Sequence, residues 1–116
     1  FIDKLEKLVM MLGYTLLKEY TVEEKQNVWK TKKYRIDAYI PELNLAIEYD
    51  GYNHKVKNQQ NKDKEKEETV RRILGCRIIR CKSDYPDYYN FGLIFKEILN
   101  VLGGIKDGTV TSSSNF

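Results

Sequence analysis

The stretch YRIDAYIPELNLAIEYDGYNH, residues 34–54, decides the fold that we expect for this chain. Residues 34–40 alternate between apolar and polar types, which predicts a strand. One face of it would carry Ile36, Ala38 and Ile40, and the other Arg35, Asp37 and Tyr39. Residues 45–50 alternate again, with Leu45, Ile47 and Tyr49 opposed to Ala46, Glu48 and Asp50. The short PELN segment between the two runs is typical of a turn, so we predict an antiparallel hairpin.

The chain before this hairpin predicts one helix and one further strand. Apolar residues at helical spacing over residues 2–12, ended by Gly13, predict an amphipathic helix. Residues 14–22 are rich in β-branched and aromatic types and favour a strand, although residues 16–19 could also prolong a helix. Residues 23–33 are expected to form a polar, basic connection.

The chain after the hairpin predicts a helical crossover, a parallel strand and a closing helix. Residues 51–62 are polar and are expected to form a loop that contacts the substrate. Residues 63–74 predict a helix that begins near Asp63 and ends at Gly75, and residues 76–81 a buried strand inserted in parallel. Residues 89–102 predict the last helix, with Phe91, Ile94, Phe95, Ile98 and Leu102 on one stripe. The expected fold class is α/β, with the order α-β-β-β-α-β-α and a mixed sheet flanked by helices.

The composition indicates a single globular domain. The chain has 116 residues, of which 41% are apolar and 32% charged, and no apolar run approaches a membrane span. We expect residues 1–102 to form this domain and the Gly/Ser/Thr-rich residues 103–116 to form a poorly ordered tail. The chain starts at Phe1 without a signal-peptide pattern, so we expect a segment of a longer protein. Cys76 and Cys81 have odd spacing in one strand, which argues against a mutual disulfide and favours a cytoplasmic protein.

Basic residues gather in two places, although the formal net charge is only +3. The first group lies beside Trp29 and Tyr34 and consists of Lys30, Lys32, Lys33 and Arg35. The second consists of Arg71, Arg72, Arg77, Arg80 and Lys82. Basic residues interleaved with aromatic ones suit phosphate contacts, but each group could equally be a solvated surface.

Three carboxylates would converge on the polar face of the predicted hairpin. Asp37 lies on the first strand, and Glu48 and Asp50 lie on the second. Like charges at close range raise one another's pKa, and a bound Mg²⁺ or Mn²⁺ would balance them with oxygen ligands. Such a cation also serves phosphodiester hydrolysis, because it neutralises developing charge and acidifies a bound water. The alternative is an ordinary sheet face whose acids pair with Arg35 and nearby lysines.

Three more residues are candidates for the same chemistry. His54, the single histidine, follows Gly51 after the acidic strand and could act as a general acid, a general base or a metal ligand. Asp63 is expected at the start of its helix, where a capping role explains it without catalysis. Glu6 on the first helix has no basic neighbour at i±3 or i±4, and its role is left open.

The string at residues 34–54, followed by NKDKEKEETVRRILGCRIIRCK, resembles the very-short-patch-repair-like branch of the PD-(D/E)XK nuclease superfamily. The resemblance runs from about Glu6 to Lys82 and implies a restriction-endonuclease-like α-β-β-β-α-β core. In the EDxHD pattern of phage homing endonucleases, the matching residues are Glu6, Asp37, His54 and Asp63. The resemblance implies a DNA endonuclease with Mg²⁺ or Mn²⁺ near Asp37 and Asp50 and with His54 close to the scissile phosphate, and Glu48 matches the acidic position of the (D/E)XK element, which makes it a third expected metal ligand. We expect the DNA contacts to include Lys55 and Lys57 of the polar loop together with the first basic group.

Two departures from the family pattern refine this expectation. The lysine expected two residues after Glu48 is replaced by Asp50, so His54 or a helical lysine such as Lys64 would have to substitute. The Cys/His zinc cluster of mismatch-repair relatives is missing from the sequence, which favours homing-type or restriction-type cleavage. A nuclease-fold DNA-binding module without chemistry and a protein-interaction domain are the alternatives. A homodimer and a DNA-recognition domain outside this chain are left open.

Overall fold

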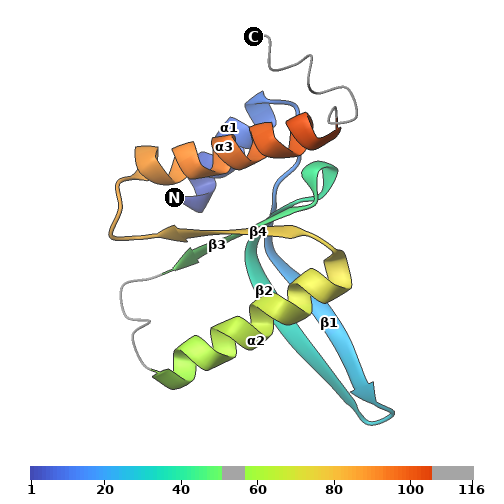
Figure 1. Cartoon of the computed structure of the whole chain (residues 1–116). Helices are drawn as coiled ribbons and strands as arrows, with labels where there is room; N and C mark the ends of the chain where they lie inside the picture. Colours follow the sequence, from blue (N-terminus) through green and yellow to red (C-terminus); the bar gives the residue numbers. More distant parts are fainter. Residues whose placement is uncertain (51–56, 106–116) are drawn as a thin grey trace.

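A computed structural model of the chain describes the backbone of residues 1–50 and 57–105 and the side chains of residues 1–50 and 62–103. The elements follow one another in the predicted order (Figure 1). They are α1 (Ile2–Met11), β1 (Leu17–Asn27), β2 (Lys30–Ile40), the 3-10 turn η1 (Pro41–Leu43), β3 (Leu45–Asp50), α2 (Lys57–Leu74), β4 (Arg77–Lys82) and α3 (Asp87–Ile105). The α/β class with a mixed sheet flanked by helices is therefore confirmed. Within the described residues, no helix is long and apolar enough to cross a lipid bilayer.

The sheet has the strand order β1-β2-β3-β4. β1 and β2 form a long antiparallel hairpin, β2 and β3 are antiparallel, and β3 and β4 are parallel, as the helical crossover predicts. The pairing of β2 with β3 covers only Ala38–Ile47, Tyr39–Ala46 and Ile40–Leu45. Residues 30–37 of β2 therefore have a strand neighbour, β1, along one edge only.

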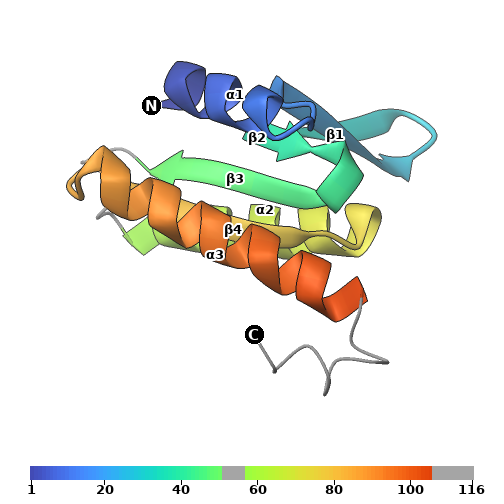
Figure 2. The same ribbon diagram turned by 90° about the horizontal axis from the view of Figure 1, so that it is seen from above.

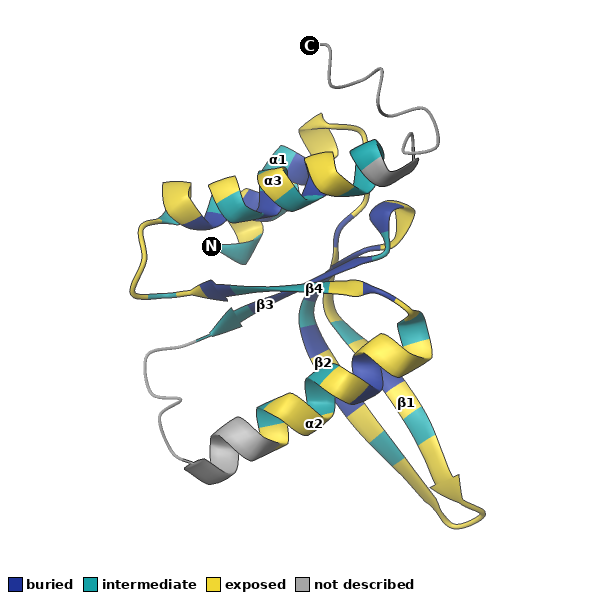
Figure 3. Ribbon diagram, in the orientation of Figure 1, coloured by how far each residue is buried: buried dark blue, intermediate teal, exposed yellow. Residues whose placement is uncertain are grey.

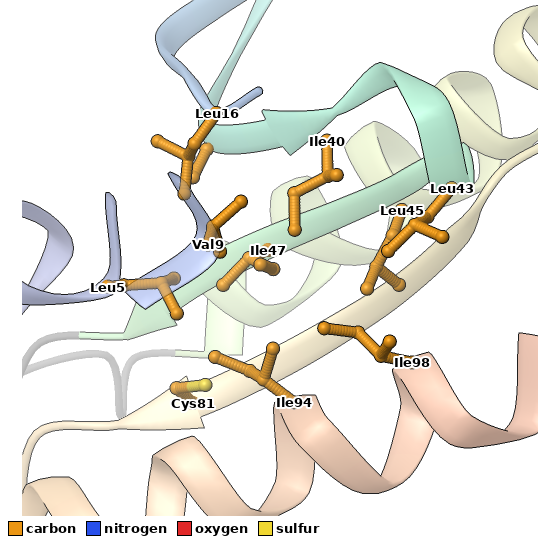
Figure 4. Packing of buried hydrophobic residues seen from close by; sticks show 11 residues of the cluster. Leu5, Val9, Leu16, Ile40, Leu43, Leu45, Ile47, Cys81, Ile94 and Ile98 are labelled. Atoms are coloured by element: carbon orange, nitrogen blue, oxygen red, sulfur yellow. The ribbon is translucent and has the colours of Figure 1, made fainter. Parts of the chain in front are cut away.

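Two layers of helices cover the two faces of the sheet. α1 and α3 lie on one face, which we call the α1/α3 face, and α2 lies on the other, the α2 face (Figures 1 and 2). Figure 4 shows the core of the α1/α3 face. It contains Leu5, Val9, Leu16, Ala38, Ile40, Leu43, Leu45, Ile47, Cys81, Ile94 and Ile98. Each buried aliphatic side chain stabilises the fold by about 1.5–3 kcal/mol, so this layer carries most of the hydrophobic stabilisation.

The core of the α2 face is smaller and consists of Val22, Tyr34, Ile36, Tyr39, Ala46, Val70 and Cys76. β3 alternates as predicted, because Leu45 and Ile47 belong to the first cluster and Ala46 to the second. Cys76 and Cys81 are buried, free and in opposite clusters, as their spacing predicts. Burial raises the pKa of the Cys81 thiol to about 12, which is the behaviour of a core residue.

The predicted alternation of the second strand is wrong at one point. Ile36 packs in the α2-face core, whereas Ala38 and Ile40 pack in the α1/α3-face core. The change occurs at Asp37, where the ladder with β1 omits the facing residue Glu19, which has a φ of +50°. A non-glycine residue in this left-handed region marks a local distortion, which reverses the side-chain faces of β2.

Several predicted boundaries are also wrong. The basic connection at 23–33 is the distal part of the β1/β2 hairpin, since β1 reaches Asn27 and β2 starts at Lys30. Residues 57–62 are not loop but the start of α2, since Lys and Gln favour helices even without an apolar pattern. α3 extends to Ile105, into the expected tail. The remainder of the predicted loop, residues 51–56, and of the tail, residues 106–116, lies outside the described residues.

Candidate metal and nucleic-acid site

Charged side chains gather where the first half of α2 passes over β2, β3 and β4. α2 directs Asp63, Lys66 and Glu67 toward the sheet, at helical spacing from the buried Val70. The sheet supplies Asp37, Glu48, Asp50 and Arg80 on the same side. The α2 face thus has a carboxylate, Glu48, among its buried residues, whereas the buried cluster of the α1/α3 face is apolar.

Asp37 lies where β2 separates from β3. The Tyr49 N–H donates a hydrogen bond to Asp37 Oδ2 at 2.7 Å, beyond the last paired residues Ala38 and Ile47. The carboxylate therefore satisfies a backbone donor that has lost its strand partner. This contact fixes Asp37 at the end of the short β2/β3 ladder and beside Glu48.

Glu48 is a buried carboxylate next to Asp37 and below α2. Its exposed fraction is only 8%, and Lys66 Nζ lies 2.5 Å from its Oε1. Burial raises the pKa of Glu48 to about 7, and Asp37 raises it further while Lys66 opposes the shift. A proton, Lys66 or a cation can neutralise this carboxylate near neutral pH.

Asp50, the third predicted carboxylate, forms an ion pair with Arg80. Its carboxylate accepts hydrogen bonds from Arg80 Nη1 at 3.0 and 3.3 Å, and Arg80 Nε donates to Glu67 Oε2 at 2.7 Å. The predicted convergence therefore holds for Asp37 and Glu48, but Asp50 is joined to α2 through Arg80. In the part of the chain with described side chains, no three Asp, Glu, His or Cys side chains are arranged to hold one metal ion.

Asp63 lies inside α2 rather than at its start, because the helix begins at Lys57. The predicted capping role is thus wrong. Asp63 lines a groove with Asp50 and Arg80, and it also lines a second groove with Asp37. Lys64 is exposed and lines only the first of these grooves; Lys66 is the α2 lysine that contacts Glu48.

Glu6 belongs to α1 and therefore to the α1/α3 face. Its carboxylate lies 3.4 Å from Lys18 Nζ, an ion pair between α1 and β1. Lys18 pairs along the ladder with Ala38, the residue after Asp37. Glu6 is thus close to Asp37 along the sheet but is positioned by a helix on the opposite face.

The predicted basic groups have different surroundings. Lys32, Lys33 and Arg35 line an open groove of about 510 Å³ along the free edge of β2. The groove also contains Tyr34, Asp37, Lys62, Asp63, Glu65 and Lys66. Lys30 starts β2 at the hairpin turn. The arginines of the second group are engaged in ion pairs with Glu67, Glu24, Glu97 and Asp50.

The remaining candidates, His54 and Lys55, lie outside the described residues, as does the side chain of Lys57. Lys66 and the Arg80–Glu67 pair are the residues that sequence reasoning missed. Lys66 and Glu67 lie four and three positions before Val70, so the helical period could have predicted that they share its sheet-facing side.

The donor set of Asp37 and Glu48 fits a hard divalent cation. Both side chains offer carboxylate oxygens, and Mg²⁺ is bound in proteins by one or two carboxylates while waters and substrate phosphates complete its coordination. Burial raises the pKa of Glu48 to about 7, so a cation at this carboxylate would compete with a proton near neutral pH. These two residues therefore suit a divalent cation that is shared with a phosphate.

Comparison of the chain with models of protein families, with curated proteins and with solved structures gives no match.

Proposed function

We propose that this chain is a metal-dependent DNA endonuclease domain that hydrolyses phosphodiester bonds. The proposal depends on one observation above all: the adjacent carboxylates of Asp37 and Glu48, with Lys66, lie beside a groove rich in cations. The order of acidic residues along the chain, which resembles the EDxHD pattern, supports the same conclusion.

The groove along β2 suits a nucleic-acid backbone. Five cationic residues line it, Lys32, Lys33, Arg35, Lys62 and Lys66, against three acidic ones, Asp37, Asp63 and Glu65. Duplex DNA carries a negative charge about every 1.7 Å of its axis, and binding neutralises phosphates with Lys and Arg. A backbone that follows this groove would bring a phosphate to Asp37.

The residues of the chain have separable roles in the proposed reaction. Asp37 and Glu48 would hold Mg²⁺ or Mn²⁺, which when bound neutralises charge on the phosphate and acidifies a water. The Tyr49 N–H holds Asp37 in place. Lys66 carries a cationic Nζ at Glu48, where it can orient a phosphate oxygen or a water. In the family pattern that cation is the lysine two residues after Glu48, and here it would come from α2.

Cleavage of plasmid DNA with Mg²⁺ or Mn²⁺ tests this function. Asp37→Asn keeps an oxygen that can accept the Tyr49 hydrogen bond but removes the charge, so the fold should survive while cleavage falls at least about a hundredfold. Asp84→Asn, at an exposed acid in the β4–α3 connection, is the matched control and should cleave as the parent does. Equal products from the parent and Asp37→Asn would refute the proposal.

A DNA-binding module without catalysis is the second candidate. The groove favours it too, since its cations would bind a phosphate backbone whether or not hydrolysis follows. The two functions separate in one experiment, because this candidate predicts salt-dependent binding of a labelled duplex and no metal-dependent product at any protein concentration.

A further inference from the structure

The tip of the β1/β2 hairpin presents a large apolar surface to solvent. Val28 and Trp29 form the turn between the strands, and their exposed fractions are 79% and 93%. The hairpin projects beyond α2, and its distal part is exposed along both strands (Figures 1 and 3). Neither side chain belongs to a hydrophobic cluster of the described residues.

The backbone of this tip is held in place although its side chains are not. The Trp29 N–H donates to Asn27 Oδ1 at 2.8 Å, and the ladder continues to the pair Asn27–Lys30. Adjacent apolar residues that are exposed together can form a binding surface, because their burial against a partner releases water. The Trp29 indole is thus exposed to solvent on an ordered turn.

The charge around the tip favours a polyanion. Lys25 and Lys30 lie on the two strands beside the turn, and Lys33 lies further along β2 opposite Glu23; none of the three has an ion pair among the described side chains. Lys32 is the neighbouring lysine that is already paired, with Glu65 of α2 at 3.1 Å. An apolar protein partner would gain nothing from three unpaired lysines, whereas a phosphate backbone would neutralise them.

We propose that the hairpin tip enters the major groove of duplex DNA and places Trp29 against the bases. The major groove, about 12 Å wide, admits a two-stranded β ribbon, and apolar side chains there contact the exposed methyl groups of thymines. Lys25, Lys30 and Lys33 would contact the flanking phosphates. This inference rests on the proposed function, because it assigns a second contact to the same DNA.

The geometry of β2 relates this contact to the candidate site. Seven residues separate Lys30 from Asp37 along one strand, which is about 23 Å at 3.3 Å per residue. That length corresponds to about seven base pairs of B-form DNA at 3.4 Å each. A duplex whose axis runs along β2 would have its groove contact roughly seven base pairs from the phosphate at Asp37.

The fluorescence of Trp29 tests the proposal directly, because it is the single tryptophan of the chain. The Asp37→Asn protein, which leaves DNA intact under the proposed function, is titrated with a duplex while binding is followed by the anisotropy of the labelled DNA. We expect Trp29 emission to be quenched and its access to acrylamide to fall as the duplex binds. A minor-groove ligand bound beforehand should leave the quenching unchanged.

Paired variants separate the contact of the tip from general binding. Trp29→Ala should weaken duplex binding about tenfold. Tyr88→Ala removes a comparably exposed aromatic, 78% exposed, at the start of α3 on the opposite face and should bind as the parent does. Cleavage by the parent chain is measured separately.

The outcomes distinguish this inference from the proposed function. Duplex binding with Trp29 still fully accessible to acrylamide overturns the inference but leaves the endonuclease proposal standing. Protection of Trp29 without cleavage by the parent chain supports the tip contact and overturns the endonuclease. Loss of quenching with a minor-groove ligand overturns the major-groove assignment, and the lack of any duplex binding overturns both proposals.

Discussion

The same strands present different kinds of side chain on the two faces of the sheet. On the α1/α3 face, the buried residues of β2, β3 and β4 are apolar, and the fully buried Leu5, Val9 and Ile94 of the helices pack against them, while the Arg77–Glu97 ion pair lies at the exposed margin. On the α2 face, β3 and β4 present Glu48, Asp50 and Arg80, and Lys66 and Glu67 of α2 form ion pairs with Glu48 and Arg80. The first face can therefore stabilise the fold while the second tolerates charges that a stable core would exclude.

The difference is most marked along β3, where each residue belongs to one face or the other. Leu45 and Ile47 are fully buried in the first core, and Glu48 between Ile47 and Tyr49 is a buried acid with a pKa raised to about 7. Consecutive residues of one strand thus provide an apolar core residue and a buried carboxylate. Substitutions at Ile47 and Glu48 should therefore change the free energy of unfolding in opposite directions.

Ile47→Ala is expected to have the largest effect. Ile47 is completely buried among α1, α3 and the strands, and its truncation leaves a cavity that lowers the free energy of unfolding by about 4 kcal/mol. Urea unfolding followed by circular dichroism measures it. A loss of less than about 1 kcal/mol would mean that the α1/α3 face is not the main source of stability.

Glu48→Gln, one residue further on, should instead stabilise the protein above neutral pH. The folded protein binds a proton at Glu48 more tightly than the unfolded chain, because burial raises its pKa from 4.5 to about 7. The free energy of unfolding of the parent therefore falls as the pH rises through this window and stays low above it. Gln mimics the neutral form, so the variant should be more stable by about 3 kcal/mol near pH 8.

The pH dependence of the stability difference between Glu48→Gln and the parent provides an internal control. The advantage of Glu48→Gln should shrink to near zero at about pH 4.5, where Glu48 is protonated in the folded parent. A variant that is less stable than the parent at both pH values would show that the Lys66 ion pair outweighs the burial of the carboxylate.

Arg80→Met should have a smaller effect, about 2 kcal/mol of lost stability. Arg80 joins Asp50 of β3 to Glu67 of α2, and its removal leaves Asp50 without its cation and Glu67 with only the half-exposed Arg71. Lys4→Met, which breaks the Lys4–Asp87 pair with a lysine side chain 72% exposed, is the matched change on the other face and should be neutral. Thermal unfolding compares the two, and equal losses would contradict the contrast between the faces.

The sequence predicted the parts of the fold that depend on local periodicity. The order of elements, the alternation of β3, the parallel entry of β4 and the apolar stripe of α3 all follow from repeating apolar positions. The face reversal at Asp37 could not be predicted in this way. It depends on the left-handed conformation of Glu19, which is neither Gly nor Asn and carries no local signal for it.

The candidate site was predictable in its acids but not in their partners. Strand alternation predicted that Glu48 and Asp50 share one face of their strand, and the hairpin predicted that Asp37 lies close to them, which holds for Glu48. The separation of Asp50 from this pair depends on Arg80, which arrives from a strand 30 residues later. Which acid Arg80 pairs with depends on the tertiary structure, and the spacing of residues along the chain does not predict it.

Manganese-dependent stability measures the central claim most directly, namely that Asp37 and Glu48 together bind a divalent cation. The melting temperature of the parent is recorded at about pH 8 as Mn²⁺ is raised, alongside Asp37→Asn and Asp84→Asn. A ligand at a hundred times its dissociation constant adds about 2.7 kcal/mol, so the parent and Asp84→Asn should rise by several degrees and Asp37→Asn should not. An equal response of all three proteins, or none in the parent, would contradict the metal site.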